Sequence, residues 1–204
     1  MSDQQYAIPA GPVIFEEEIK KSRFITRLMH TPSIDTAKAF VAQIKTEFSD
    51  ARHNCWAFVA GAPSNSMQYG FSDDGEPSGT AGKPMLNQLA GSGVGEITAI
   101  TTRYSGGIKL GTGGLVKAYG GGVKQALLEL QTVQKVPLTC IQLRVPFDQV
   151  NLLEYVTKEQ GGIISDRVYS DVVCCKLEVP TQLAQLSTDR LIELSKGKIQ
   201  TIDD

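Results

Sequence analysis

The distribution of glycine constrains this chain more than any other feature of its sequence. The chain has 20 glycines, and they are densest between Gly70 and Gly122. Glycine is favoured where the backbone turns sharply, or where another backbone or a ligand comes very close. We therefore expect residues 70–122 to form the functional surface of a folded domain.

Hydrophobic periodicity outlines the first part of the chain. Short apolar segments predict strands, and apolar residues every three or four positions predict helices. Ser33 and Thr112 are suitable N-caps for the first and last of these helices. We expect strands over residues 13–19, 23–30, 55–61 and 96–104, and helices after Ser33, over 83–91 and after Thr112.

The helix after Thr112 contains three consecutive glycines, Gly120, Gly121 and Gly122. Each glycine in a helix interior costs about 1 kcal/mol relative to alanine. A summed penalty of about 3 kcal/mol indicates that another backbone or a ligand comes very close there, or that the helix bends.

The chain changes character after Pro137. Strands are expected over residues 138–147, 163–169, 172–179 and 198–202, and helices over 149–160 and 180–195. The resulting order βαββαβ is that of a ferredoxin-like domain. We therefore expect an α+β protein with two domains, residues 1–136 and 139–204.

Charge excludes a bulk electrostatic attraction to nucleic acid, because the net charge is −2. Residues 1–138 carry 13 basic and 12 acidic side chains, a net +1, and residues 139–204 carry 7 and 10, a net −3. Any binding of phosphate requires a local basic patch, and we expect it in the first domain.

The cysteines and the N-terminal segment exclude other classes. The four cysteines form no CxxC pair and only two histidines are present, so we expect no metal and no cofactor. No basic and apolar leader and no apolar run of about 20 residues is found, which predicts a cytoplasmic protein that does not enter a membrane.

An acidic turn, Asp73-Asp74-Gly75-Glu76, lies inside the glycine-dense stretch. Three carboxylates so close together could hold Mg²⁺ or act as acid and base. The alternative, which we favour on the turn alone, is turn chemistry with solvated charges.

Two further loops have features of phosphate sites. In the first, Gly79, Thr80 and Gly82 precede Lys83, but Pro77 and Pro84 occupy positions that the Walker motif requires for other residues. A weaker anion-binding nest remains open.

The second loop follows Arg103-Tyr104 and carries Lys109 before a helix start. This arrangement suits phosphate, although Val116 breaks the dinucleotide-binding pattern. A tight strand–helix connection explains the glycines equally well.

His53 has no partner nucleophile in a recognised triad.

Three motifs in fixed order span the first domain: residues 20–24 (KKSRF), 72–82 (SDDGEPSGTAG) and 103–115 (RYSGGIKLGTGGL). Together they resemble the Impact family, in its bacterial two-domain branch. Ser105 departs from the family pattern, which usually has a second aromatic residue there. The expected signature surface comprises His53, Asp73, Asp74, Gly75, Glu76, Gly79, Thr80, Gly82, Gly106, Gly107, Gly111, Gly113 and Gly114.

The resemblance implies a first domain with the α+β fold of domain four of elongation factor G and of small-molecule kinases. It implies a second, ferredoxin-like domain similar to the last domain of that factor. Eukaryotic relatives are linked to translational control, which they exert with an additional N-terminal domain that we do not expect in this protein.

Our leading hypothesis is a non-enzymatic regulator of translation that binds RNA or the ribosome. The expected phosphate contacts are Lys20, Lys21, Arg23, Lys83, Arg103, Lys109 and Lys117, with Phe71 or Tyr104 stacking on bases. The alternatives are an enzyme or sensor for a small phosphorylated ligand or nucleotide, and a protein–protein adaptor.

Overall fold

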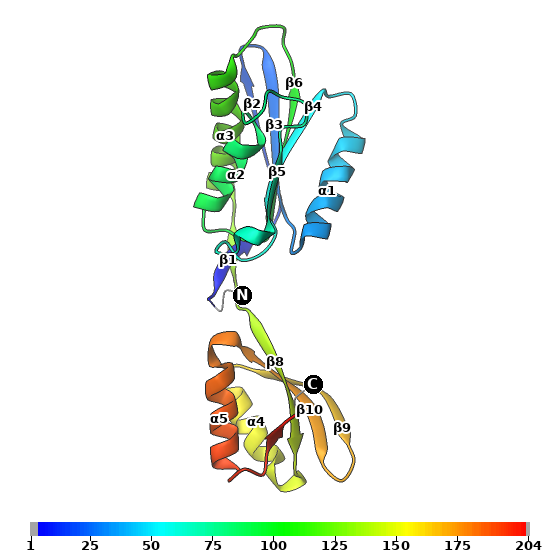
Figure 1. Ribbon diagram of the computed structural model, residues 1–204, viewed down its shortest axis with the longest axis vertical. Coiled ribbons are helices and arrows are strands. Elements are labelled where there is room, and N and C mark those ends of the chain that lie inside the picture. The colour runs from blue at the N-terminus through cyan, green and yellow to red at the C-terminus, as the bar shows by residue number, and fades with distance from the viewer. Residues whose placement is uncertain (1–3, 203–204) are drawn as a thin grey trace. The chain divides into compact units, whose positions relative to one another are not determined.

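The computed structural model describes residues 4–202, in two compact units: a first unit of Tyr6–Lys135, and a second of residues 136–202 together with residues 4–5. Both units combine helices with antiparallel sheets, so the expected α+β class is confirmed (Figure 1). No helix within the described range is long and apolar enough to cross a membrane.

The first unit is built on a five-stranded antiparallel sheet in the order β2-β3-β6-β4-β5. A separate two-stranded sheet pairs β1 with β7. The strands are β1 (Tyr6–Pro9), β2 (Val13–Ile19), β3 (Ser22–His30), β4 (His53–Val59), β5 (Tyr69–Ser72), β6 (Ile97–Tyr104) and β7 (Thr132–Lys135).

Helices cover both faces of this sheet (Figure 1). They are α1 (Ile34–Glu47), α2 (Gly82–Gly91) and α3 (Thr112–Glu129). The larger core packs α2 and α3 against one face, where Phe24 and Tyr119 meet edge to face. On the other face α1 packs through Phe40, Val41 and Ile44 against Ile100. The central strand β6 is therefore almost completely buried.

Local signals at the helix starts are partly as expected. Ser33 caps α1 in a capping box with Thr36. The N-cap of α3 is Gly111 and not Thr112. The N-cap position has a φ of 77°, a conformation that glycine adopts without strain and threonine does not. Thr112 is instead the first residue of the helix.

The three glycines of α3 meet three different surroundings. A Cβ at Gly122 would lie 2.7 Å from Thr26 Oγ1 on β3, so the expected close approach is confirmed there. A Cβ at Gly120 would make an ordinary 3.6 Å contact with Pro84, and one at Gly121 would meet open space.

The second unit has the predicted order βαββαβ, with its sheet in the order β11-β8-β10-β9. Its core gathers the inward-facing residues of β8 and β10 with Leu153, Val156 and Leu191 from the helices. The elements are β8 (Leu138–Val145), α4 (Val150–Glu159), β9 (Ile163–Tyr169), β10 (Val173–Pro180), α5 (Ala184–Leu194) and β11 (Gln200–Thr201).

Candidate functional site

Strand pairing brings the glycine-rich motifs to one end of the five-stranded sheet. Arg23 on β3 pairs with Tyr104 on β6, and Arg103 pairs with His53 on β4. The connections next to these residues therefore gather at the same end, as Figure 1 shows. We call it the loop end; it comprises residues 19–22, 48–53, 73–81 and 103–114.

Asp73 occupies the anion nest that the sequence suggested in front of Lys83. Its carboxylate accepts hydrogen bonds from the backbone N–H groups of Gly79, Ala81 and Gly82, at 2.8, 2.9 and 2.8 Å. Burial opposes ionisation of Asp73, but the three donors outweigh it and hold its pKa below the usual value. The start of α2 is thus satisfied from within the chain.

The surrounding loop is shaped to deliver these donors. Gly75 and Gly79 have φ values of 85° and 76°, which favour glycine. A Cβ at Gly82 would lie 2.7 Å from backbone atoms of Ser72, so α2 approaches β5 closely there. Thr80 is buried and donates its hydroxyl to the carbonyl of Pro77.

Asp74 points to a different set of partners. Its carboxylate accepts from Lys45 Nζ on α1 at 2.5 Å and from the backbone N–H of Asn54 at 2.7 Å. His53 Nδ1 lies 3.0 Å from the Asp74 carbonyl oxygen. Asp74 and His53 therefore fasten the acidic turn to α1 and β4.

Glu76 and Arg103 form an ion pair in the interior of the unit. Arg103 Nη1 donates to Glu76 Oε1 at 2.7 Å, and Tyr119 donates to the same oxygen at 2.8 Å. The Arg103 side chain is only 10% exposed and also lies 5.6 Å from the Phe24 ring centroid. Arg103, expected to contact phosphate, thus directs its guanidinium mainly into the protein.

The three carboxylates of the acidic turn therefore diverge, each toward its own partners. Among residues 4–202, no group of three or more His, Cys, Asp or Glu side chains is arranged to hold a metal ion. The nearby Cys55 is a poor nucleophile, because burial raises the pKa of its thiol to about 12.

The loop between β6 and α3 remains open to solvent. A Cβ at Gly106 would lie 1.8 Å from the Lys21 carbonyl oxygen, so this glycine lets the loop pack against the β2–β3 turn. Gly107, with φ of 81°, and Gly111 are both exposed. Gly113 faces open space in the first turn of α3, and Gly114 lies beside Leu110.

The start of α3 differs from that of α2 in having no internal anion. Gly111 offers no side-chain cap, and the first turn contains no acidic residue. The first N–H groups of a helix have no intrahelical acceptor and carry a partial positive charge. This helix start therefore favours an external anion.

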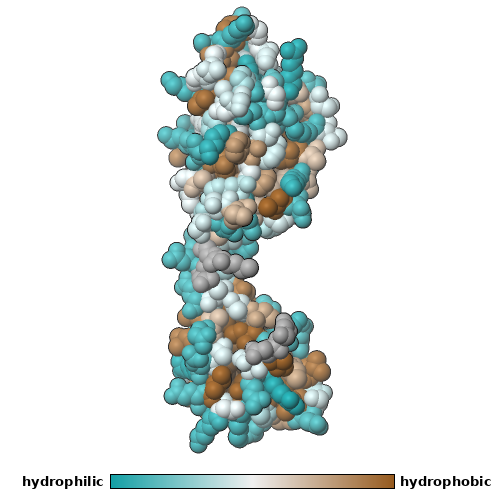
Figure 2. Space-filling model, viewed as in Figure 1, coloured by the Kyte–Doolittle hydropathy of each residue, from teal (hydrophilic) through white to brown (hydrophobic). Residues whose placement is uncertain are grey.

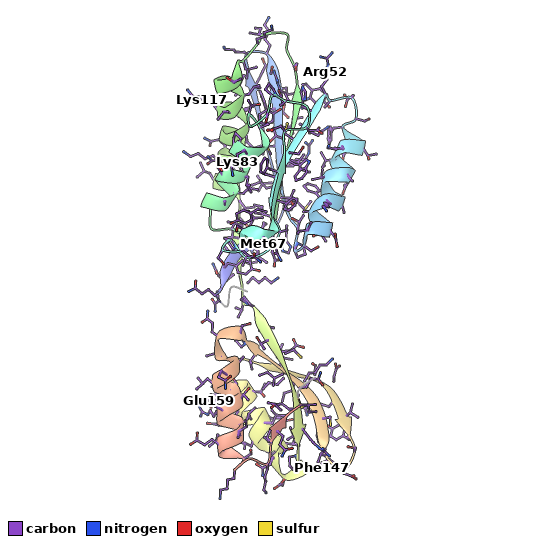
Figure 3. All side chains as sticks on the ribbon, viewed as in Figure 1. Arg52, Met67, Lys83, Lys117, Phe147 and Glu159 are labelled. Atoms are coloured by element: carbon purple, nitrogen blue, oxygen red, sulfur yellow. The ribbon has the colours of Figure 1, made fainter. Side chains whose placement is uncertain are left out.

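The predicted basic residues fall into three groups. Lys20, Lys21 and Lys109 are exposed at the loop end, and they have no hydrogen bond or ion pair with any residue in the described range. Arg23 is paired with Glu16 at 2.5 Å. Lys83 lies on α2 and Lys117 lies on α3. Figure 3 shows that Lys83 is farther from the loop end than Arg52 is.

A pocket of about 390 Å³ opens at the loop end. Tyr104 donates its hydroxyl to Asp50 at 3.0 Å, while Arg52 is exposed and without a partner among the described residues. Partial burial, followed by the Asp50 carboxylate, raises the pKa of Tyr104. The pocket is lined by Asp50, Arg52, Arg103, Tyr104, Ser105 and Gly107.

No sequence motif identifies Asp50 or Arg52 as a candidate site residue. They lie between α1 and β4 without a glycine-rich motif of their own. The only signal was a polar, charged connection beside His53, which many surface loops share. Figure 2 shows hydrophilic residues at this end of the unit, with paler and some hydrophobic residues among them.

Comparisons with known proteins agree with this architecture. A family profile described as the Impact N-terminal domain matches residues 20–127, and one described as a domain of unknown function (DUF1949) matches residues 143–198. A solved structure titled "Crystal structure of an hypothetical protein" is similar with a TM-score of 0.75 and 52% identity, over 98% of each chain.

Curated relatives match over nearly the whole chain. IMPACT family member YigZ of Escherichia coli (strain K12) is 52% identical over 199 residues, covering 98% of both chains. An IMPACT family member of Haemophilus influenzae is 47% identical, over 96% of this chain and 95% of the relative. With both the profile and these full-length relatives in agreement, the chain belongs to the Impact family.

Proposed function

We propose that this chain regulates translation without catalysis, by binding RNA of the ribosome through the loop end of its first unit. Membership of the Impact family supports a translation-related regulatory role in general. The finer proposal, RNA as the ligand and the loop end as the surface, depends on the distribution of unpaired positive charge.

The contrast between the two helix starts carries the proposal. Asp73 already fills the N-terminus of α2, whereas the start of α3 is open and has no acidic residue in its first turn. Lys20, Lys21 and Lys109 lie in the same cluster of loops, exposed and without acidic partners in the described range. Open N–H groups beside unpaired lysines suit the phosphates of a nucleic-acid backbone.

The contact set is therefore smaller than the sequence suggested. Arg103 forms an ion pair with Glu76, and Arg23 forms one with Glu16. We therefore assign the main phosphate contacts to Lys20, Lys21 and Lys109. Lys117, exposed on α3, extends this surface. Because the unit is close to neutral overall, we expect modest affinity with a marked dependence on salt.

The test compares two triple variants by anisotropy with single-stranded RNA and by cosedimentation with ribosomes. Lys20→Ala/Lys21→Ala/Lys109→Ala removes three charges from the loop end. Lys38→Ala/Lys124→Ala/Lys158→Ala removes three exposed, unpaired lysines elsewhere. We expect only the first variant to weaken binding. It should also make the negative slope of log K against log salt shallower by about 2.

Equal losses of RNA affinity in the two triple variants would mean that binding depends on general positive charge, and would contradict its assignment to the loop end. Absence of RNA affinity at low salt, together with absence of ribosome cosedimentation, would overturn the proposal itself. A small phosphorylated ligand is the weaker candidate, because Asp73 fills the anion nest and the carboxylates of the acidic turn diverge.

A further inference from the structure

The pocket at the loop end differs from the lysine-rich surface beside it. Its lining combines an exposed carboxylate, Asp50, with an exposed and unpaired guanidinium, Arg52, and an aromatic ring, Tyr104. The charge of Arg103, which also lines it, is offset by Glu76 at 2.7 Å. The net charge of the pocket lining is therefore close to zero, and the lining exposes a hydrogen-bond acceptor, Asp50, and a donor, Arg52.

This lining does not suit a bare phosphate, because Asp50 would repel it. A nucleobase fits better, since its edges present donors and acceptors and its face stacks on an aromatic ring. Guanine places two N–H donors, on N1 and N2, next to each other, where a carboxylate can accept both. Its O6 and N7 form the acceptor pair that arginine binds with two hydrogen bonds.

We propose that this pocket takes one unpaired guanine of the bound RNA. Tyr104 supplies the stacking surface, Asp50 accepts from guanine N1–H and N2–H, and Arg52 donates to O6 and N7. The guanine is unpaired because the edge that Asp50 reads is the one used in base pairing. The inference rests on the proposed function, and it adds base selectivity to a surface that otherwise reads phosphates.

The tyrosine hydroxyl leaves room for this recognition. It donates to Asp50 Oδ1, and no other hydrogen bond to Asp50 is formed by the described residues, so Oδ2 is available. The same hydrogen bond fixes the Tyr104 ring next to the carboxylate. Ring and acceptor are thus already positioned before a ligand binds, which lowers the entropic cost of binding.

The test uses short single-stranded RNAs of uridine that carry one central guanosine, adenosine or cytidine, with all-uridine RNA as the reference. We expect the guanosine RNA to bind at least about fivefold more tightly than the others. Asp50→Asn should abolish this preference. The all-uridine RNA, whose bases lack the adjacent N1–H and N2–H donors of guanine, is the reference within each protein.

A folding defect would lower the free energy of unfolding and weaken binding of every RNA, whereas loss of recognition removes only the preference for guanosine; urea denaturation of Asp50→Asn distinguishes the two. Equal affinity of the wild type for all four RNAs, with binding still sensitive to Lys20→Ala/Lys21→Ala, would overturn the guanine pocket and leave the proposed function standing. A preference that survives in Asp50→Asn would overturn it as well.

If no RNA binds at low salt, titration with guanosine monophosphate decides the matter. Binding to the wild type and not to Asp50→Asn would support guanine recognition and contradict the proposed function. Binding to neither protein would overturn both.

Discussion

Arg103 and Glu76 meet in the interior of the first unit, where Nη1 and Oε1 are 2.7 Å apart and both side chains are at least nine-tenths buried. Their contact joins the end of β6 to the acidic turn. Tyr119 on α3 donates a hydrogen bond to the same Glu76 oxygen and so joins α3 to them. Two charged residues that the sequence suggests are exposed thus hold β6, the acidic turn and α3 together at the loop end.

Glu76→Ala is expected to destabilise the protein by about 3–5 kcal/mol, because it leaves the buried Arg103 guanidinium without its counter-ion. Urea denaturation measures this change. Glu16→Ala is the matched control, since Glu16 pairs with Arg23 on the surface, where both side chains are about half exposed. It is expected to change the free energy of unfolding far less, because solvent screens this exposed pair. Similar small losses in both variants would show that the buried pair has no special role.

Asp73→Asn is expected to lower stability at neutral pH by about 0.5–2 kcal/mol, the range for losing a helix cap. Folding depresses the pKa of Asp73, so its contribution is fully present above the unfolded value of about 3.9 and is lost as pH falls through the lower folded value. The difference between wild type and variant should therefore shrink below about pH 4. Urea midpoints measured across acidic pH check this, and a constant difference would contradict the assignment.

Elements with strong local signals could be predicted from the sequence. Ser33 marks the start of α1, and the succession of expected strands and helices after Pro137 predicts the βαββαβ order. The strands β1, β5 and β7 were missed. Each has only four residues, and β1 and β7 pair across more than 120 positions of the chain. Such short segments are specified by their partner rather than by their own periodicity.

The glycine motifs predict the position of the loop end but not the role of each polar residue in it. Asp73, Asp74 and Glu76 are nearly adjacent in sequence, yet their partners lie at the start of α2, on α1 and on β6. Only the tertiary arrangement separates them. Because Arg52 and Asp50 carry no motif, their place in a pocket emerges only when β4 is set beside β6.

The glycines of α3 provide a paired test of close packing. Gly121→Ala is expected to stabilise the protein by about 0.5–1 kcal/mol, because it meets open space and favours the helix. Gly122→Ala is expected to destabilise it by about 1–3 kcal/mol, because its Cβ would lie 2.7 Å from Thr26 Oγ1. Thermal unfolding distinguishes the two. Equal stabilisation by both variants would mean that β3 yields to the new side chain.

Gly106→Ala is expected to disturb both the loop end and its proposed binding. The added Cβ would lie 1.8 Å from the Lys21 carbonyl oxygen, so the β2–β3 turn and the loop after Tyr104 must separate. That movement shifts Lys20 and Lys21 away from the start of α3, and RNA affinity should fall together with stability. Gly91→Ala is the control, because it adds a methyl group at the end of α2, outside the loop end, where the rest of the chain leaves open space. RNA anisotropy and urea denaturation of both variants provide the measurement. If Gly106→Ala binds RNA as tightly as Gly91→Ala, the close packing of these two loops is not required for binding.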